Sequence, residues 1–426
     1  MEYLLFVGYL LIFAWLVTKV KFFTRTGLSN PQLLIIFFLK VIAAILYGWI
    51  GIYYGGYAKM WDTWTFHTLG LYEYNLMLTD PGEYLTNLFR NGYDDGMSRF
   101  FESRNSYWND LKGNVFVKMI SIFDLFSFGN YYINAIFYSF LSLFGPLALY
   151  RVMNDAFPNK KRILTGAIWG IPSFLYWTSG MHKEGMIFTG IAVSFYCVYF
   201  ARKSGYFSAK KIIALILSVL MVLILRNFIA ILLVPALFTW YFSDRLKKNG
   251  LLIFSTFYLL FIIFFFNIRY LVPQLDFPKA VAEKQQAFIK IKHGNTRVAI
   301  YPLEPTAKSF LEKTPQAIRL TLLRPQPRDI HHALSFISVS EMFLFYLLIL
   351  LFVWKRKKEP FDRNMILFCL FFSMSVLLAI GFSNNNIGAI VRYRSIVLPF
   401  LIIPLAVRID WSAIYKTLNS LYYKIK

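Results

Sequence analysis

Long apolar stretches separated by short polar segments recur along the whole chain of 426 residues. A helix that crosses a bilayer needs about 20 mostly apolar residues, because its backbone must satisfy its own hydrogen bonds inside lipid. By this criterion the pattern predicts about eleven transmembrane helices. They are expected near residues 3–18, 32–54, 130–150, 163–179, 185–201, 212–225, 228–242, 251–268, 336–354, 364–382 and 391–408.

Composition supports an all-α integral membrane protein. Hydrophobic residues make up 58% of the chain and charged residues only 16%, which is too apolar for an ordinary water-soluble protein. The first apolar stretch has neither a basic segment before it nor a small-residue cleavage pattern after it, so it is expected to be retained as a helix. We therefore expect residues 1–426 to form a single polytopic membrane domain.

The distribution of positive charge predicts the orientation. The net charge is +23, but the Lys and Arg residues occur in short clusters between apolar runs, which argues against a nucleic-acid partner. Six basic segments occur at every second connection, and the positive-inside rule assigns them to the cytoplasm. They begin at Lys19, Arg151, Arg202, Arg245, Lys355 and Lys416. The prediction is an N-out, C-in protein of a bacterial inner (plasma) membrane.

Two segments, residues 55–129 and 269–335, are too long to be turns, and alternation assigns both to the outer face. Residues 115–128 within the first loop are expected to form an amphipathic helix lying in the membrane interface. In the second loop, the pattern predicts a helix over 279–292 and another that begins with Thr314 as its cap and Pro315 in its first turn. These outer loops are the first places to look for function.

The first candidate site is the string from Trp61 to His67, next to the outer end of the second predicted helix. Asp62 is the candidate catalytic base, and His67 a candidate substrate-binding residue. Asp94 and Asp95, farther along the same loop, are further acidic candidates. The alternative is that the string is an interfacial aromatic belt carrying a solvated acid.

The second candidate site is the tight outer turn from Ser179 to Gly185, which contains His182, Lys183 and Glu184. A charged side chain without a partner is costly this close to lipid, so three adjacent ionisable residues suggest substrate binding. The alternative is a self-neutralising turn in which Lys183 pairs with Glu184 and His182 caps a helix.

The third candidate is Arg392 with Arg394, at the outer mouth of the last predicted helix, where positive charge breaks the positive-inside pattern. Arginine suits bidentate contact with phosphate, so an anionic ligand is expected. A helix would point the two side chains about 200° apart, whereas an extended segment would put them on one face. Arg324 adds to the same positive field, while Arg226 and Arg269 are better explained as snorkelling toward headgroups.

Residues inside the apolar stretches suggest no further chemistry. Cys197 and Cys369 lie in apolar runs and form neither a disulfide framework nor a metal-binding spacing. Lys40 is near enough to the cytoplasmic end of its predicted helix to snorkel there.

Together, these segments resemble the GT-C superfamily of polytopic glycosyltransferases. The resemblance rests on the acid in MWDTWTFH, on WTSGMHKEG from Trp177 to Gly185, and on NNNIGAIVRYRSIVLPF from Asn384 to Phe400. The segment from Pro315 to Glu341, with LLRP and HHAL, looks like uncharacterised bacterial membrane proteins placed near that group.

The resemblance implies transfer of a sugar from a polyprenyl-phosphate-linked donor to a lipid-linked or surface glycan acceptor. The acid of the first outer loop, here Asp62, would be the general base, and basic residues would hold the donor phosphate. Membrane lipids are the other expected partners, no cofactor is assigned, and a divalent metal stays open. One alternative is an O-antigen-like polysaccharide polymerase, which would use the same outer face. The other is a lipid or polysaccharide transporter, which would require charges in the middle of its membrane-spanning helices and internal repeats.

Overall fold

The computed structural model describes residues 2–54, 61–94, 100, 106–243, 245–246, 249–290, 296–357 and 361–425. Within these ranges the chain is helical, with two isolated β-bridges, Arg297 to Asn386 and Arg356 to Ile409. The first half contains α1 (Glu2–Lys19), α2 (Lys21–Thr24), α3 (Asn30–Tyr53), α4 (Trp61–Thr79), α5 (Pro81–Thr86), α6 (Tyr107–Ser127), α7 (Tyr131–Ala156), α8 (Lys161–Trp169), α9 (Pro172–Ser179) and α10 (Lys183–Ser204). The second half contains α11 (Ala209–Leu225), α12 (Asn227–Ser243), α13 (Gly250–Asn267), α14 (Phe277–Lys290), α15 (Ala307–Leu322), α16 (Ala333–Trp354), α17 (Arg363–Ser383), α18 (Ile387–Ser395), α19 (Leu398–Arg408) and α20 (Trp411–Ile425).

Seven of the described helices are long and apolar enough to cross a membrane, namely α1, α3, α7, α10, α13, α16 and α17. The pair α18 and α19, bent by 62°, makes an eighth if it counts as one crossing. The other predicted crossings are shorter: α11 and α12 have 17 residues each, and residues 163–179 divide into α8 and α9. That division follows from Pro172, which begins α9 and disfavours helical geometry at Ile171 before it.

The core lies around α7 and α10, and in each of these helices 78% of the 18-residue apolar stretch is buried. Phe195 of α10 stacks on Trp240 of α12 and Phe368 of α17, with ring centroids 4.8 and 5.1 Å apart. In contrast, only 17% of the corresponding stretches of α13 and α16 is buried, and many of their apolar side chains are exposed. This arrangement is what a lipid solvent permits, because apolar side chains on the periphery cost nothing there.

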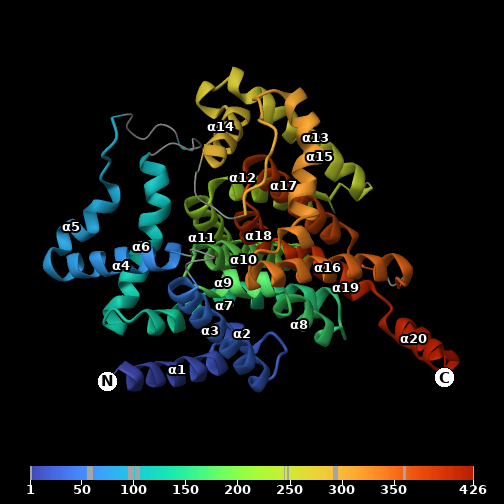
Figure 1. Ribbon diagram of the computed structural model, residues 1–426, viewed down its shortest axis with the longest axis horizontal. Helices are drawn as coiled ribbons and strands as arrows, with labels where there is room; N and C mark the ends of the chain where they lie inside the picture. Colours follow the sequence, from blue (N-terminus) through green and yellow to red (C-terminus); the bar gives the residue numbers. More distant parts are fainter. Residues whose placement is uncertain are drawn as a thin grey trace.

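The segments flanking the core lie at different ends of the molecule (Figure 1). Helices α4 and α5 extend from one end, whereas α20 leaves the bundle at the other, and α14 lies along a third edge. Helix α6 of the first predicted loop packs against α4, α7 and α11, and α14 and α15 of the second pack against α17. These contacts place the two long predicted loops against the core helices instead of leaving them as free linkers.

Some local predictions need correction. Helix α14 lies close to the predicted 279–292, but α15 begins at Ala307 and not at Thr314. Thr306 is the cap, accepting from the Ser309 amide at 3.3 Å, while Pro315 lies inside the helix. Thr314 donates its hydroxyl back to the Phe310 carbonyl (2.8 Å), as a hydroxyl within a helix does. The helix expected over 115–128 begins earlier, at Tyr107, because Ser106 caps it.

Lys40 is also placed differently from the prediction. It does not snorkel: its side chain is buried, and its ammonium donates to the Thr178 carbonyl at 3.1 Å and the Ser179 hydroxyl at 3.2 Å. Carbonyls at a helix C-terminus lack partners within the helix, so a cation there satisfies them. Lys40 therefore ties α3 to the end of α9, next to the turn that carries His182.

Candidate functional site

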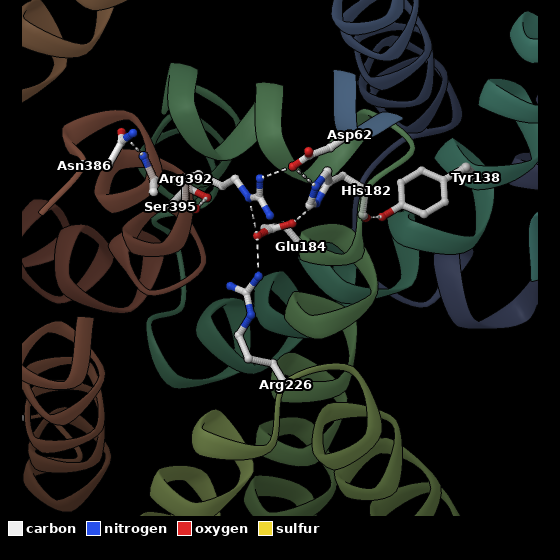
Figure 2. Close-up of polar contacts among 9 residues, drawn as sticks. Asp62, Tyr138, His182, Glu184, Arg226, Asn386, Arg392 and Ser395 are labelled. Atoms are coloured by element: carbon white, nitrogen blue, oxygen red, sulfur yellow. Dashed lines mark hydrogen bonds and ion pairs between the residues drawn. The ribbon is translucent and has the colours of Figure 1, made fainter. Parts of the chain in front are cut away.

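Four side chains from separate parts of the chain converge at one place (Figure 2). Asp62 lies in the first turn of α4, Glu184 in the first turn of α10, Arg226 between α11 and α12, and Arg392 on α18. The N-terminal turns favour carboxylates, because the unpaired amides there create partial positive charge.

Glycines let the turn between α9 and α10 approach its neighbours. A Cβ at Gly180 would overlap the ring of Tyr47, and one at Gly185 would overlap the Tyr138 hydroxyl and the Thr178 carbonyl. The Tyr138 hydroxyl donates to the His182 carbonyl. These close contacts hold His182 and Glu184 at a defined depth in the bundle.

Glu184 is the centre of the cluster. Its side chain is fully buried, and its Oε1 accepts from Arg392 Nε at 2.9 Å and from Arg226 Nη2 at 2.8 Å. Its Oε2 contacts His182 Nδ1. A buried carboxylate is costly unless its lone pairs are satisfied, and here three cationic or polar partners surround it.

Asp62 lies at the open side of the same cluster, with 57% of its side chain exposed. Its Oδ2 accepts from Arg392 Nη1 at 2.7 Å and lies 3.4 Å from His182 Nε2. His182 and Arg392 together hold the pKa of Asp62 well below its usual range, against the opposing effect of burial. Asp62 is consequently a charged, accessible carboxylate whose proton affinity is suppressed by its partners.

Aromatic rings lie next to the cationic groups of the site. The Arg392 guanidinium lies 5.7 Å from the Trp177 ring and 5.2 Å from Tyr393, and Arg226 lies over Tyr393 at 4.1 Å. The Lys183 ammonium lies over Phe66 at 5.1 Å. Rings placed in this way stabilise cations while leaving their charge available to a ligand.

An apolar groove of about 1150 Å³ adjoins the cluster, part of it open to the surroundings. It lies between α3, α9, α16 and α18 and includes Trp177, which also faces Arg392. Most of its lining is apolar, and its polar residues include Asp329, His332, Ser335 and Ser338. A long apolar chain in this groove could therefore end beside the Arg392 guanidinium.

The structure brings some of the predicted residues together and separates others. Asp62, His182, Glu184 and Arg392 contact one another, and Lys183 is adjacent. Arg394 is fully buried and donates to the carbonyls of Thr321 (2.8 Å) and Arg324 (2.7 Å), away from Asp62. Helix α18 includes both arginines, so their side chains point in different directions, as expected for a helix. The extended segment that would put both on one face is not formed.

The remaining candidates lie outside the cluster. His67 is buried against the rings of Tyr131 and Trp64, and burial lowers its pKa to about 4. Asp94 is exposed, and Asp95 lies outside the described residues. Arg324 pairs with Asp329 at 3.7 Å.

Two alternative interpretations are corrected by these contacts. The turn is not self-neutralising, because Glu184 bonds to His182, Arg226 and Arg392, and no described ion pair joins it to Lys183. Arg226 and Arg269 do not simply snorkel: Arg226 binds Glu184, and Arg269 donates to the Pro305 carbonyl at 3.1 Å. Arg226 lies between the apolar runs of α11 and α12, and a charge at such a position is the sequence signal for a buried partner.

Within the described ranges, no group of three or more His, Cys, Asp or Glu side chains is arranged to hold a metal ion. No family model, curated protein or solved structure matches this chain. Function must therefore be inferred from the cluster and its surroundings.

Proposed function

We propose that this protein is a membrane glycosyltransferase that moves a sugar from a polyprenyl-phosphate-linked donor to a lipid-linked or surface glycan acceptor. The observation that carries the proposal is Asp62, an exposed carboxylate held by Arg392 beside a wholly buried Glu184. A carboxylate that can take a proton, next to an arginine that can hold a phosphate, is the minimum that this reaction needs.

The apolar groove beside Arg392 supports a lipid-linked donor. A polyprenyl chain lying along α3, α9 and α16 would present its phosphate at Arg392, because Trp177 lines the groove and faces that guanidinium. The sugar, attached to this phosphate, would then lie near Asp62. This geometry uses binding energy from the chain to position the reacting atoms.

In the proposed reaction, the acceptor hydroxyl attacks the anomeric carbon and gives its proton to Asp62. The bond between the anomeric carbon and the phosphate oxygen breaks, and the phosphate leaves with the electron pair. Arg392 stabilises the charge on that leaving phosphate. Since Arg392 also holds Asp62 at 2.7 Å, a donor phosphate would compete for it and raise the basicity of Asp62 as the donor binds.

The proposal includes about eleven membrane crossings, with the N-terminus outside, the C-terminus inside and the cluster on the outer face of a bacterial plasma membrane. Its support is the alternation of basic segments. In addition, the cluster lies near the C-terminal ends of α3 and α11 and the N-terminal end of α10. If these helices are antiparallel crossings, those ends lie on the same face of the membrane.

Asp62→Asn tests the proposal, because an amide keeps the size of the carboxylate but cannot take a proton. We expect transfer from a polyprenyl-phosphate-linked sugar to fall by about 100-fold or more, with the protein still folded in the membrane. Asp80→Asn is the matched control, since Asp80 caps the nearby α5 and Asn caps equally well. Transfer by Asp62→Asn at the wild-type rate would remove Asp62 from the mechanism.

A further inference from the structure

A second group of cations lies close to Arg226. It consists of Lys112 on α6, Lys183 at the start of α10, Arg226, and Lys284 on α14. Arg226 belongs to both groups, because it binds Glu184 through Nη2 while its Nη1 is buried without a partner among the described residues. We call these four residues the lysine cluster.

The three lysines of the lysine cluster have no counter-charge of their own, whereas Arg226 is paired with Glu184. Lys112 donates to Asn109 Oδ1 at 3.0 Å, and Lys183 and Lys284 lie over the rings of Phe66 and Phe228. None of these three lysines forms an ion pair in the described part of the chain. Burial and the nearby Arg226 lower the pKa of Lys112 to about 8, and burial with Arg226 and Lys112 lowers that of Lys284 to about 7. The cations therefore repel one another, and an anion would relieve this repulsion.

A separate apolar groove of about 590 Å³, part of it open to the surroundings, begins beside three of these cations, between α6, α10 and α11. Lys112 precedes its first lining residue on α6 by about one turn, Lys183 precedes Met186 by one turn, and Arg226 directly follows Leu225. Three of the cations are therefore at the same end of the groove. Its lining includes Val115, Phe116, Met119, Met186, Leu220 and Leu225.

We propose that the lysine cluster and this groove bind a second lipid, one with a terminal diphosphate headgroup, and that this lipid is the acceptor. An apolar groove with cations at one end matches an anionic amphiphile, and three lysines without ion pairs exceed what a single phosphodiester charge would neutralise. The acceptor role rests on the proposed function. The binding does not, because it needs no transfer.

The test measures binding of geranylgeranyl diphosphate to the full-length protein in nanodiscs of phosphatidylcholine. We expect Lys112→Gln and Lys284→Gln each to weaken binding by about tenfold or more, because each removes a charge-assisted contact to the diphosphate. Lys279→Gln is the matched control, since Lys279 is exposed on the same helix as Lys284. Thermal unfolding without ligand checks that the variants are folded.

A second pair of variants tests the groove. Leu220→Trp fills part of the groove and should weaken binding of geranylgeranyl diphosphate but not of inorganic diphosphate. Ile213→Trp, exposed on the same helix outside the groove lining, should change neither. Equal binding of phosphatidylglycerol would overturn the diphosphate headgroup, and equal loss of both probes in Leu220→Trp would overturn the lipid chain.

Lipid binding and sugar transfer are measured separately, so the second lipid site and the proposed reaction can fail independently. Absence of binding to the wild-type protein, or unchanged binding in both lysine variants, would overturn the second site while leaving transfer by Asp62 untouched. Conversely, Asp62→Asn should bind the probe as the wild type does. If Asp62→Asn transfers sugar normally while the lysine variants lose binding, the proposed reaction fails and the lipid site stands.

Discussion

At the scale of single residues, Glu184 organises the candidate site. It is fully buried, yet it connects α10 to Arg226, Arg392 and His182. Its carboxylate supplies the negative charge that balances these partners. Removing one member of a buried ion network leaves uncompensated charge, which costs more than the pairing itself gains.

Glu184→Gln should therefore be strongly destabilising. The amide cannot balance two guanidinium groups, so we expect a loss of about 3–5 kcal/mol in the free energy of unfolding. Thermal or denaturant unfolding in detergent measures it. Glu312→Gln is the control, because Glu312 is 54% exposed in a surface pair with Lys308, and such pairs contribute about 1 kcal/mol at most. A Glu184→Gln protein as stable as Glu312→Gln would contradict the assignment.

At the scale of elements, α18 carries two arginines with different environments. Arg392 faces Asp62 and Glu184, whereas Arg394 joins α18 to the end of α15 through two backbone carbonyls. The helical period separates them by about 200°, so one helix supplies both a cation of the Glu184 cluster and a structural anchor.

Arg392→Lys should weaken binding of a polyprenyl monophosphate by about tenfold, because lysine keeps the charge but loses the planar donor geometry. Arg394→Lys should leave that affinity unchanged and lower stability by about 1–3 kcal/mol, because carbonyls at the end of α15 lose donors. Binding in nanodiscs and thermal unfolding give the two readouts. Equal loss of affinity in both variants would show that Arg394 also contacts the ligand.

At the scale of the whole molecule, the orientation of the bundle decides which face the cluster serves. We propose that α4 and α5 lie outside and α20 inside, and these helices lie at different ends of the molecule (Figure 1). Cys197 and Cys369 are both buried, so alanine at these two positions gives a background free of thiols.

In that background, single cysteines at exposed positions report the topology. Arg90→Cys and Lys308→Cys should react with an impermeant thiol reagent in intact cells, whereas Lys210→Cys should react only after lysis. The opposite pattern would put the cluster in the cytoplasm and remove an outer-face transferase from consideration.

The sequence by itself determined the helical membrane class and most of the long helices, because apolar length and the spacing of Lys and Arg are local properties. It also identified Asp62, His182, Glu184 and Arg392 individually, since charge next to lipid is rare. The continuous crossing expected over 163–179 was less predictable: Pro172 divides it, and local hydropathy does not register such a break.

Only the tertiary structure decided which of these residues meet. Asp62 and Arg392 are 330 positions apart, and no local pattern records their 2.7 Å contact. The sequence also did not predict the partners of Arg226 and Lys40. Arg226 was expected to face lipid headgroups but binds Glu184, and Lys40 is buried against the end of α9. A charged side chain in an apolar run must find a partner, but the partner lies on another helix, and only packing determines which one.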